Sequence, residues 1–193
     1  MGKTFVALAL AVAAGGAVVS SAPASAQNQL TRNEIITSLY KTEGAVAKLD
    51  PAALQAAADR AAASGGDNAT GLLSDQLRSL PQISVEINFD RGSDRIRPES
   101  YESVGLIADA FHSPYLMGQL FVVVGNTDAT GTREVNLALS KRRAASVRDA
   151  LTTTFAVPAE QLVAIGLGEE QLQDPQHPDS GVNRRVQIIN LGE

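Results

Sequence analysis

The chain has 193 residues, of which 44% are hydrophobic and 19% are charged, and it carries a formal net charge of −5. This length and composition are typical of one modest globular domain with additional segments. The absence of cysteine excludes disulfides, thiolate metal sites, cysteine nucleophiles and a lipid-modified N-terminal cysteine. An acidic chain also disfavours nucleic acid as a partner.

Residues 1–26 have the pattern of a secretory signal peptide. Lys3 supplies a positive start, residues 5–19 form an apolar run, and Ala24-Ser25-Ala26 is a cleavage site before Gln27. The alternative, a transmembrane anchor, is disfavoured because the run is short, is interrupted by glycine and lacks a basic stop-transfer flank. We therefore expect an exported chain with no membrane span after cleavage, and loss of Lys3 changes its formal charge from −5 to −6.

Residues 27–80 are predicted to form a helical segment rich in small residues, followed by a linker. Thr31 and Glu34 fit a capping box at the start of one helix. Asp50-Pro51 combines an N-cap with proline at the first helical position, opening an alanine-rich helix that Gly65-Gly66 would end. The glycine-rich stretch 65–71 is the linker.

Residues 81–193 show the periodicities of a domain that combines strands and helices. Polar and apolar residues alternate over 83–89, as in a half-buried strand, and a helix is predicted from Pro98 to Phe111. The β-branched run 120–124 is typical of a central strand buried on both faces. A helix over 133–151 and short strands at 162–166 and 186–190 complete a two-layer domain of order β-α-β-α-β-β.

Arg143 occupies an unexpected position on the predicted helix 133–151. At about 100° per residue, it falls inside the apolar stripe that Val135, Leu139, Val147 and Leu151 define, and so does Asn136. An arginine is seldom buried without a partner, because unpaired burial of a charge costs several kcal/mol. The pattern therefore predicts that Arg143 has an anionic partner, either in the protein or in a ligand.

Asp128, in the loop between the strand 120–124 and this helix, is the candidate anion. Gly125 and Gly131 would let the loop turn tightly and bring Asp128 near Arg143. The two residues could form a structural salt bridge. Alternatively, they could stand apart across a cleft and bind a small zwitterion, with Asp128 on an ammonium and Arg143 on a carboxylate. Asn136, which has both a donor and an acceptor, would complete such a site.

Five dispersed motifs resemble the peptidoglycan-associated domain of the OmpA C-terminal family. They are FD at 89–90, TDATG at 127–131, Asn136, LSKRRA at 139–144 and NRRV at 183–186. The resemblance covers residues 81–193 and implies an α+β domain with a mixed sheet. It also implies that Asp128 binds the ammonium and Arg143 the carboxylate of the diaminopimelate in the peptidoglycan stem peptide.

The resemblance further places Asn136, Asp90 and Arg184 around the same cleft. It implies a periplasmic protein without enzymatic activity or cofactor, associated with the outer membrane or the cell wall and contributing to the integrity of the cell envelope. The chain departs from the family at Asn126, where the family usually has histidine. Asparagine can form hydrogen bonds but does not titrate near neutral pH, so we expect the site to persist with altered loop details.

The sequence leaves two other classes of function to consider. Residues 27–80 could dock an outer-membrane or envelope protein, which is compatible with wall binding. A wall hydrolase is disfavoured, because His112 and His177 are the only histidines and neither lies in a nucleophile or metal-ligand pattern. Carboxylate pairs for glycoside hydrolysis are not marked by any spacing.

Overall fold

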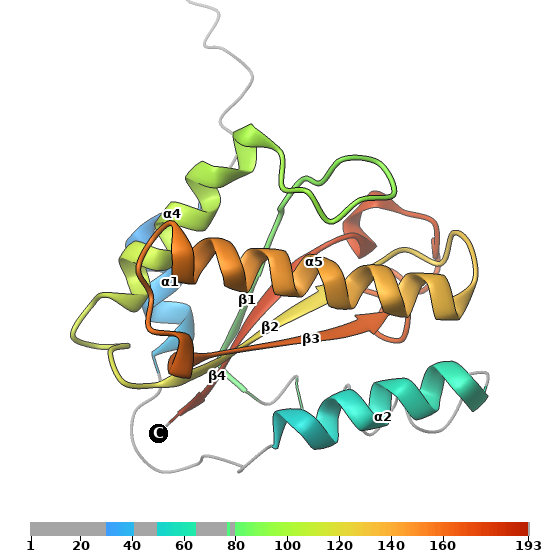
Figure 1. Cartoon of the computed structure of the whole chain (residues 1–193), viewed down its shortest axis with the longest axis horizontal. Helices are drawn as coiled ribbons and strands as arrows, with labels where there is room; N and C mark the ends of the chain where they lie inside the picture. Colours follow the sequence, from blue (N-terminus) through green and yellow to red (C-terminus); the bar gives the residue numbers. More distant parts are fainter. Residues whose placement is uncertain (1–29, 41–49, 65–76, 78–79, 193) are drawn as a thin grey trace, which may run out of the picture.

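The computed structural model describes residues 30–40, 50–64, 77 and 80–192, and Figure 1 shows the arrangement of their helices and strands. Helices α1 and α2 precede the sheet, and the rest of the chain alternates strands with helices. The α-helices are α1 (Arg32–Leu39), α2 (Pro51–Ser64), α4 (Tyr101–Phe111) and α5 (Arg133–Thr153). The strands are β1 (Gln82–Val85), β2 (Leu120–Asn126), β3 (Leu162–Gly168) and β4 (Val186–Gly192). Short 3-10 turns cover Pro98–Ser100 (η1), Ala159–Gln161 (η2) and Gly181–Asn183 (η3).

The four strands form one mixed sheet in the order β1-β4-β2-β3. Strands β2 and β3 run parallel, whereas β4 is antiparallel to both of its neighbours. The central position of β2 explains its continuous β-branched run, since Val122, Val123 and Val124 are all fully buried. This arrangement confirms the predicted α+β fold with a mixed sheet.

Helices α1, α4 and α5 cover one face of the sheet, and their apolar side chains form the larger core with it. Phe111 of α4 stacks on Phe121 of β2 with ring centroids 4.1 Å apart. A smaller core lies on the other face, where Leu54 of α2 and the buried Leu77 and Leu80 pack against the sheet. The predicted two layers therefore gain a partial third one, built from the N-terminal segment.

Both N-terminal helices begin where their capping residues predict. In α1, Glu34 N donates to Thr31 Oγ1 at 3.3 Å, while Thr31 N donates to Glu34 Oε2 at 2.7 Å, which completes a capping box. In α2, Ala52 N donates to Asp50 Oδ1 at 2.9 Å. The signal peptide, residues 27–29, the Gly65-Gly66 stop and the 65–71 linker lie outside the described residues.

The N-terminal helices are part of the folded unit. Ile35 and Leu39 of α1 have no solvent exposure and belong to the larger core. In α2, the side-chain amide of Gln55 pairs with edge strand β3: Gly166 N donates to its Oε1 at 2.9 Å, and its Nε2 donates to Gly166 O at 3.2 Å. Within the described part of the chain, no helix is long and apolar enough to cross a membrane.

Strand β1 is shorter than the alternation over 83–89 predicts. It pairs with β4 only as far as Val85, which lies opposite Val186. Beyond that point Ile87 is still buried while Glu86 and Asn88 stay exposed, and Phe89 forms an isolated bridge with Ile96. The alternation thus predicts the burial correctly, but the strand is shorter than predicted because β1 and β4 diverge after Val85 and Val186.

Candidate functional site

The five residues predicted for the site line one cavity of about 770 Å³. They come from four parts of the fold: the segment after β1, the loop after β2, helix α5 and the short link between the turn η3 and β4. Loops at the carboxyl ends of strands collect such groups on a rigid frame. The residues are Asp90, Asp128, Asn136, Arg143 and Arg184.

Asp128 is buried and has a partner on each carboxylate oxygen. Thr130 N donates to its Oδ1 at 3.0 Å, which folds the loop, and Arg184 Nη1 donates to its Oδ2 at 2.6 Å. Burial alone would raise the pKa of Asp128, but the hydrogen bonds from Arg184 and Thr130 outweigh burial and lower its pKa below the ordinary value. Asp128 is therefore an anion that remains charged in mildly acidic solution.

The structural salt bridge between Asp128 and Arg143 that the sequence left open does not form. Asp128 pairs instead with Arg184, and within the described part of the chain no ion pair joins Arg143 to a carboxylate. The guanidinium of Arg143 donates from Nε to Ser93 O at 3.0 Å, and its carbon lies 4.9 Å from the centre of the Phe89 ring. Its terminal nitrogens have no hydrogen-bond partner among the described residues.

Arg143 flanks the buried face of α5 and is itself half-buried. The apolar stripe that the sequence predicted is wrong at its first turn, because Val135 is 60% exposed. The buried residues of α5 are polar or small in its N-terminal half and mostly apolar in its C-terminal half. They are Asn136, Ser140, Ala144, Val147, Ala150 and Leu151.

Small residues set the distance between α5 and the sheet. A Cβ atom at Gly125 of β2 would overlap the backbone of Ser140, and one at Gly166 of β3 would overlap Ser140 and Lys141. Gly125 is therefore needed for close packing rather than for the loop turn that the sequence predicted. Gly131 does serve the turn, with φ at +106°.

Asn136 of α5 is hydrogen-bonded to the loop that carries Asp128. Its Nδ2 donates to Asp128 O at 3.2 Å and to Glu169 Oε2 at 2.5 Å, and the residue is 4% exposed. Glu169 was not predicted, although it directly follows the parallel strand β3 and so lies at the same sheet edge as Asp128. Arg133 contacts both Glu169, at 3.7 Å, and Glu170, at 2.6 Å. These ion pairs fix the first turn of α5 to the end of β3.

Asp90 lies at the rim of the cavity, where its half-exposed carboxylate stands 3.6 Å from Arg95 and 3.8 Å from Arg97. Asn126, the departure from the family pattern, does not line the large cavity. It is buried and its Nδ2 donates to Gln187 Oε1 at 2.9 Å. The substitution therefore acts on the polar network beneath the loop.

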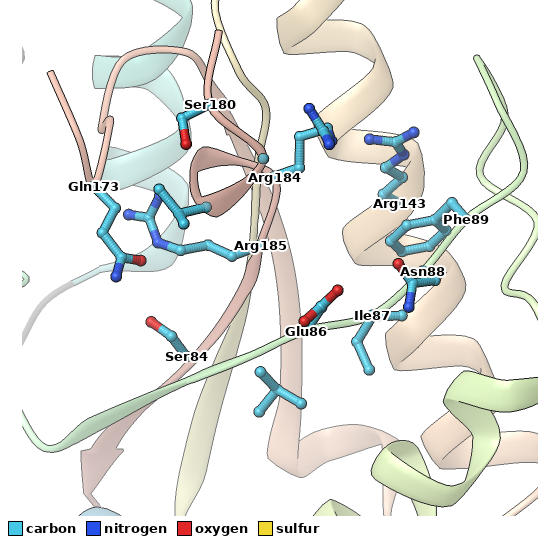
Figure 2. Close-up of a pocket in the computed structure, with 13 residues that line it drawn as sticks. Ser84, Glu86, Ile87, Asn88, Phe89, Arg143, Gln173, Ser180, Arg184 and Arg185 are labelled. Atoms are coloured by element: carbon cyan, nitrogen blue, oxygen red, sulfur yellow. The ribbon is translucent and has the colours of Figure 1, made fainter. Parts of the chain in front are cut away.

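Arg143 and Arg184 also line a second cavity of about 550 Å³ on their other side, which Figure 2 shows. The two cavities share four residues of their linings: Asn88, Phe89, Arg143 and Arg184. The site therefore combines the hydrogen-bonded carboxylate of Asp128 with the guanidinium of Arg143, whose terminal nitrogens have no hydrogen-bond partner among the described residues. Two cavities adjoin this guanidinium. Such an arrangement can bind a molecule that carries an ammonium and a carboxylate close together.

The fold and this charged cavity define a non-catalytic α+β domain of one known class. The sequence profile of the OmpA family matches residues 88–185, which is half of the chain, and the chain belongs to this family. The chain is 33% identical over 120 residues to a peptidoglycan-associated lipoprotein of Pseudomonas aeruginosa, covering 61% of this chain and 68% of the relative.

Two further relatives set the extent of the similarity. The chain is 32% identical over 113 residues to outer membrane porin F of Pseudomonas aeruginosa, which covers 58% of this chain. The chain spans about a third (32%) of the length of that porin. A solved structure of the peptidoglycan-associated lipoprotein from Burkholderia pseudomallei is 26% identical with a TM-score of 0.45, covering 56% of this chain and 88% of that one.

Proposed function

We propose that the chain binds peptidoglycan non-covalently, through the diaminopimelate of the stem peptide. The observation that carries the proposal is that one cavity contains both the anion Asp128 and the guanidinium Arg143, with no ion pair between them. The side-chain end of diaminopimelate is itself an ammonium beside a carboxylate. Membership of the OmpA family and a relative named for association with peptidoglycan support the same ligand.

In this proposal each group of the cavity has a defined role. Asp128 accepts from the ammonium while it keeps its bond to Thr130, because each carboxylate oxygen can accept more than one hydrogen bond. Arg143 donates its fork to the carboxylate, held in position by Ser93 O and the Phe89 ring. Arg184 and Asp90 complete the wall of the cavity, and Asn136 positions the loop that carries Asp128.

The test is retention of the mature chain on purified peptidoglycan that contains diaminopimelate. We expect wild type to be retained and Asp128→Ala to be lost. Asp109→Ala, an exposed aspartate of α4 that lines neither cavity, serves as the matched control and should be retained. Equal retention of the Asp128→Ala variant would contradict the proposal.

A second wall preparation tests the ligand itself. Peptidoglycan with lysine in place of diaminopimelate presents the ammonium but lacks the neighbouring carboxylate, so Arg143 would have no partner there. We expect clearly weaker retention on the lysine wall. Equal retention on both walls would contradict the role of diaminopimelate while leaving peptidoglycan binding in place.

The proposed location is the periplasm, at the wall or the outer membrane, where binding would contribute to the attachment of the two and to envelope integrity. The signal-peptide pattern and the family membership support this location. N-terminal sequencing of the protein from its native envelope should give a start at or near Gln27. A start at Met1 would contradict export by this route.

A further inference from the structure

A groove of about 500 Å³ lies along the C-terminal half of α5, outside the two cavities described above. One wall is a stripe of α5 in which Ser146, Asp149 and Thr153 follow one another at helical spacing and so share one face. The other wall is the chain from Asp94 to Tyr101, which leads into α4 (Figure 1). No residue that lines this α5 groove also lines either of the two cavities.

Polar groups with unused hydrogen-bonding capacity line the α5 groove. The carboxylate of Asp94 and the hydroxyl groups of Tyr101 and Ser146 have no hydrogen-bond partner among the described residues. Thr153 Oγ1 donates to Asp149 O at 2.6 Å and can still accept a further bond. Together these groups can donate to and accept from a ligand that is rich in hydroxyl and amide groups.

Buried apolar atoms and one partly exposed aromatic ring also line the groove. Ile96 and Ala150 are each 7% exposed, whereas Tyr101 is 39% exposed and leaves part of its ring for a ligand to cover. A sugar ring fits such a surface, because its C–H face packs on apolar and aromatic atoms while its hydroxyl groups bond to the polar edges.

The charges around the groove are balanced. Two carboxylates line it, those of Asp94 and Asp149. The guanidinium of Arg95 also lines it, and Arg148 Nη2 donates to Asp149 Oδ1 at 2.7 Å. This balance favours an uncharged ligand over a cation or an anion.

One tight loop separates the α5 groove from the cavity that contains Asp128. In this loop Ser93 N donates to Asp90 O and Asp90 N donates to Arg95 O, both at 3.0 Å. Asp90 lines the cavity, whereas Asp94 and Arg95 line the groove. A polymer that lies in the groove therefore has to cross only this loop to place a substituent in the cavity.

We propose that the α5 groove binds the glycan strand of peptidoglycan, with a sugar ring against Tyr101 and with hydroxyl and N-acetyl groups bonded to Asp94 and Ser146. This strand is uncharged wherever its lactyl groups carry stem peptides, and its repeating sugars supply the hydroxyl groups, amides and C–H faces that the groove can bind. The choice of this glycan rests on the proposed function, although the groove itself includes neither Asp128 nor Arg143.

The probe is chitotetraose, an uncharged chain of β-1,4-linked N-acetylglucosamine that carries no peptide. In a ¹H–¹⁵N NMR titration of the full mature chain, we expect it to shift the amide signals of Asp94, Tyr101 and Ser146 and to leave that of Asp128 unchanged. The dissociation constant should be of the order of 1 mM, because an open groove offers only a few hydrogen bonds. Maltotetraose, which has α linkages and no N-acetyl groups, should bind at least about tenfold more weakly. Equal binding of the two sugars would overturn the inference.

Tyr101→Ala should weaken the binding of chitotetraose at least about tenfold, because it removes the ring on which the sugar packs. Tyr101→Phe retains this ring and should keep most of the affinity. Tyr115→Ala is the matched control, since Tyr115 is a 60% exposed tyrosine that lines neither the groove nor the two cavities, and it should bind like wild type. Wild-type affinity in a well-folded Tyr101→Ala variant would also overturn the inference.

Titration with free meso-diaminopimelate separates this inference from the proposed function. We expect Tyr101→Ala to bind it as tightly as wild type does. If wild type binds diaminopimelate but chitotetraose shifts no signal of the groove, only the inference is overturned. If chitotetraose binds in the groove but diaminopimelate does not bind, the glycan site stands and the diaminopimelate function is overturned.

Discussion

At the scale of single residues, Arg143 is a half-buried cation that forms no ion pair with a carboxylate among the described residues, although Asp128 and Asp94 favour its charged form from a distance. Burial lowers the pKa of Arg143, and repulsion from Arg184 lowers it further. One carbonyl oxygen and the face of the Phe89 ring provide partial compensation. These contacts hold the Nε side of the guanidinium and leave the fork for a ligand.

Arg143→Met should weaken binding of the stem peptide at least tenfold, because charge-assisted hydrogen bonds contribute about 1.5–3 kcal/mol each. Stability should change little, since Asp128 keeps its partner Arg184 in this variant. Arg143→Lys should also bind poorly, because an ammonium cannot form the paired bonds of a guanidinium. Calorimetric titration and thermal melts of each variant measure the two effects.

Arg142→Met is the control for both variants, because Arg142 is the exposed neighbour on α5 and lines neither cavity. It should bind like wild type. Wild-type affinity in a well-folded Arg143→Met variant would show that Arg143 is not a ligand contact.

Asp128 should give a small pH-dependent contribution to stability. Its pKa in the folded chain is lowered, and a carboxyl of this kind stabilises the fold above its unfolded pKa, about 3.9 for aspartate, with that contribution lost as pH falls through the folded value. The melting temperature of wild type should therefore exceed that of Asp128→Asn by most above about pH 5, and the gap should close in stronger acid. Since Arg184 is half-exposed, solvent screens the pair and keeps the gap small. A gap that stays constant down to about pH 2 would contradict this account.

At the scale of secondary-structure elements, the position of α5 decides whether the site exists. The helix carries Asn136 and Arg143, and its close approach to the sheet depends on Gly125 and Gly166, which leave room for the Ser140 backbone. Ion pairs from Arg133 fix its first turn to the end of β3. The cavity is thus formed where one helix packs closely on two parallel strands.

Gly166→Ala should destabilise the fold by about 1–3 kcal/mol, the usual cost of forcing extra atoms into a close-packed region. The added Cβ would overlap backbone atoms of Lys141, which cannot move without shifting α5. Urea unfolding measures the loss. Gly105→Ala is the comparison: its Cβ would meet only the ring of the half-buried Phe155, and alanine is favoured over glycine in a helix by up to about 1 kcal/mol. An equal loss in both variants would rule out the packing explanation.

Elements with a clear period could be predicted from the sequence, and contacts between distant segments could not. The capping residues of α1 and α2 and the buried run of β2 are local signals, and the structure confirms them. The Asp128–Arg184 pair spans 56 positions and depends on the sheet order, which periodicity does not contain. The prediction that Val135 belongs to the buried stripe of α5 was wrong. The helix packs there through contacts between its backbone and glycines on the strands, and not through apolar side chains on the helix.

At the scale of the whole molecule, the N-terminal helices stabilise the domain while contributing nothing to the cavity walls. Ile35 and Leu39 fill the larger core, and Asn190 Nδ2 of β4 donates to Leu39 O at 2.7 Å. All residues that line the two cavities come from beyond residue 83. Their apolar faces are used inside the chain, so docking of an envelope partner through residues 27–80 remains a prediction that would depend on other surfaces.

A chain of residues 81–193 should therefore be less stable than the mature chain by several kcal/mol, since burial of each large aliphatic side chain contributes about 1.5–3 kcal/mol. Where it remains folded, it should still bind peptidoglycan. Thermal melts and wall retention measure the two properties separately. A truncated chain that folds but is not retained would show that residues 27–80 belong to the binding site.

The pairing of Gln55 with Gly166 has a consequence for the behaviour of the protein at high concentration. Strand β3 is the outer strand of its sheet, and an open outer strand is a template on which identical chains can add. The side-chain amide of Gln55 occupies one repeat of that template by imitating a neighbouring strand, donating and accepting as a backbone would. Helix α2 thereby covers part of the β3 edge and disfavours self-association through it. Such protection would be useful to a protein bound at high local concentration along a polymer of repeating ligands.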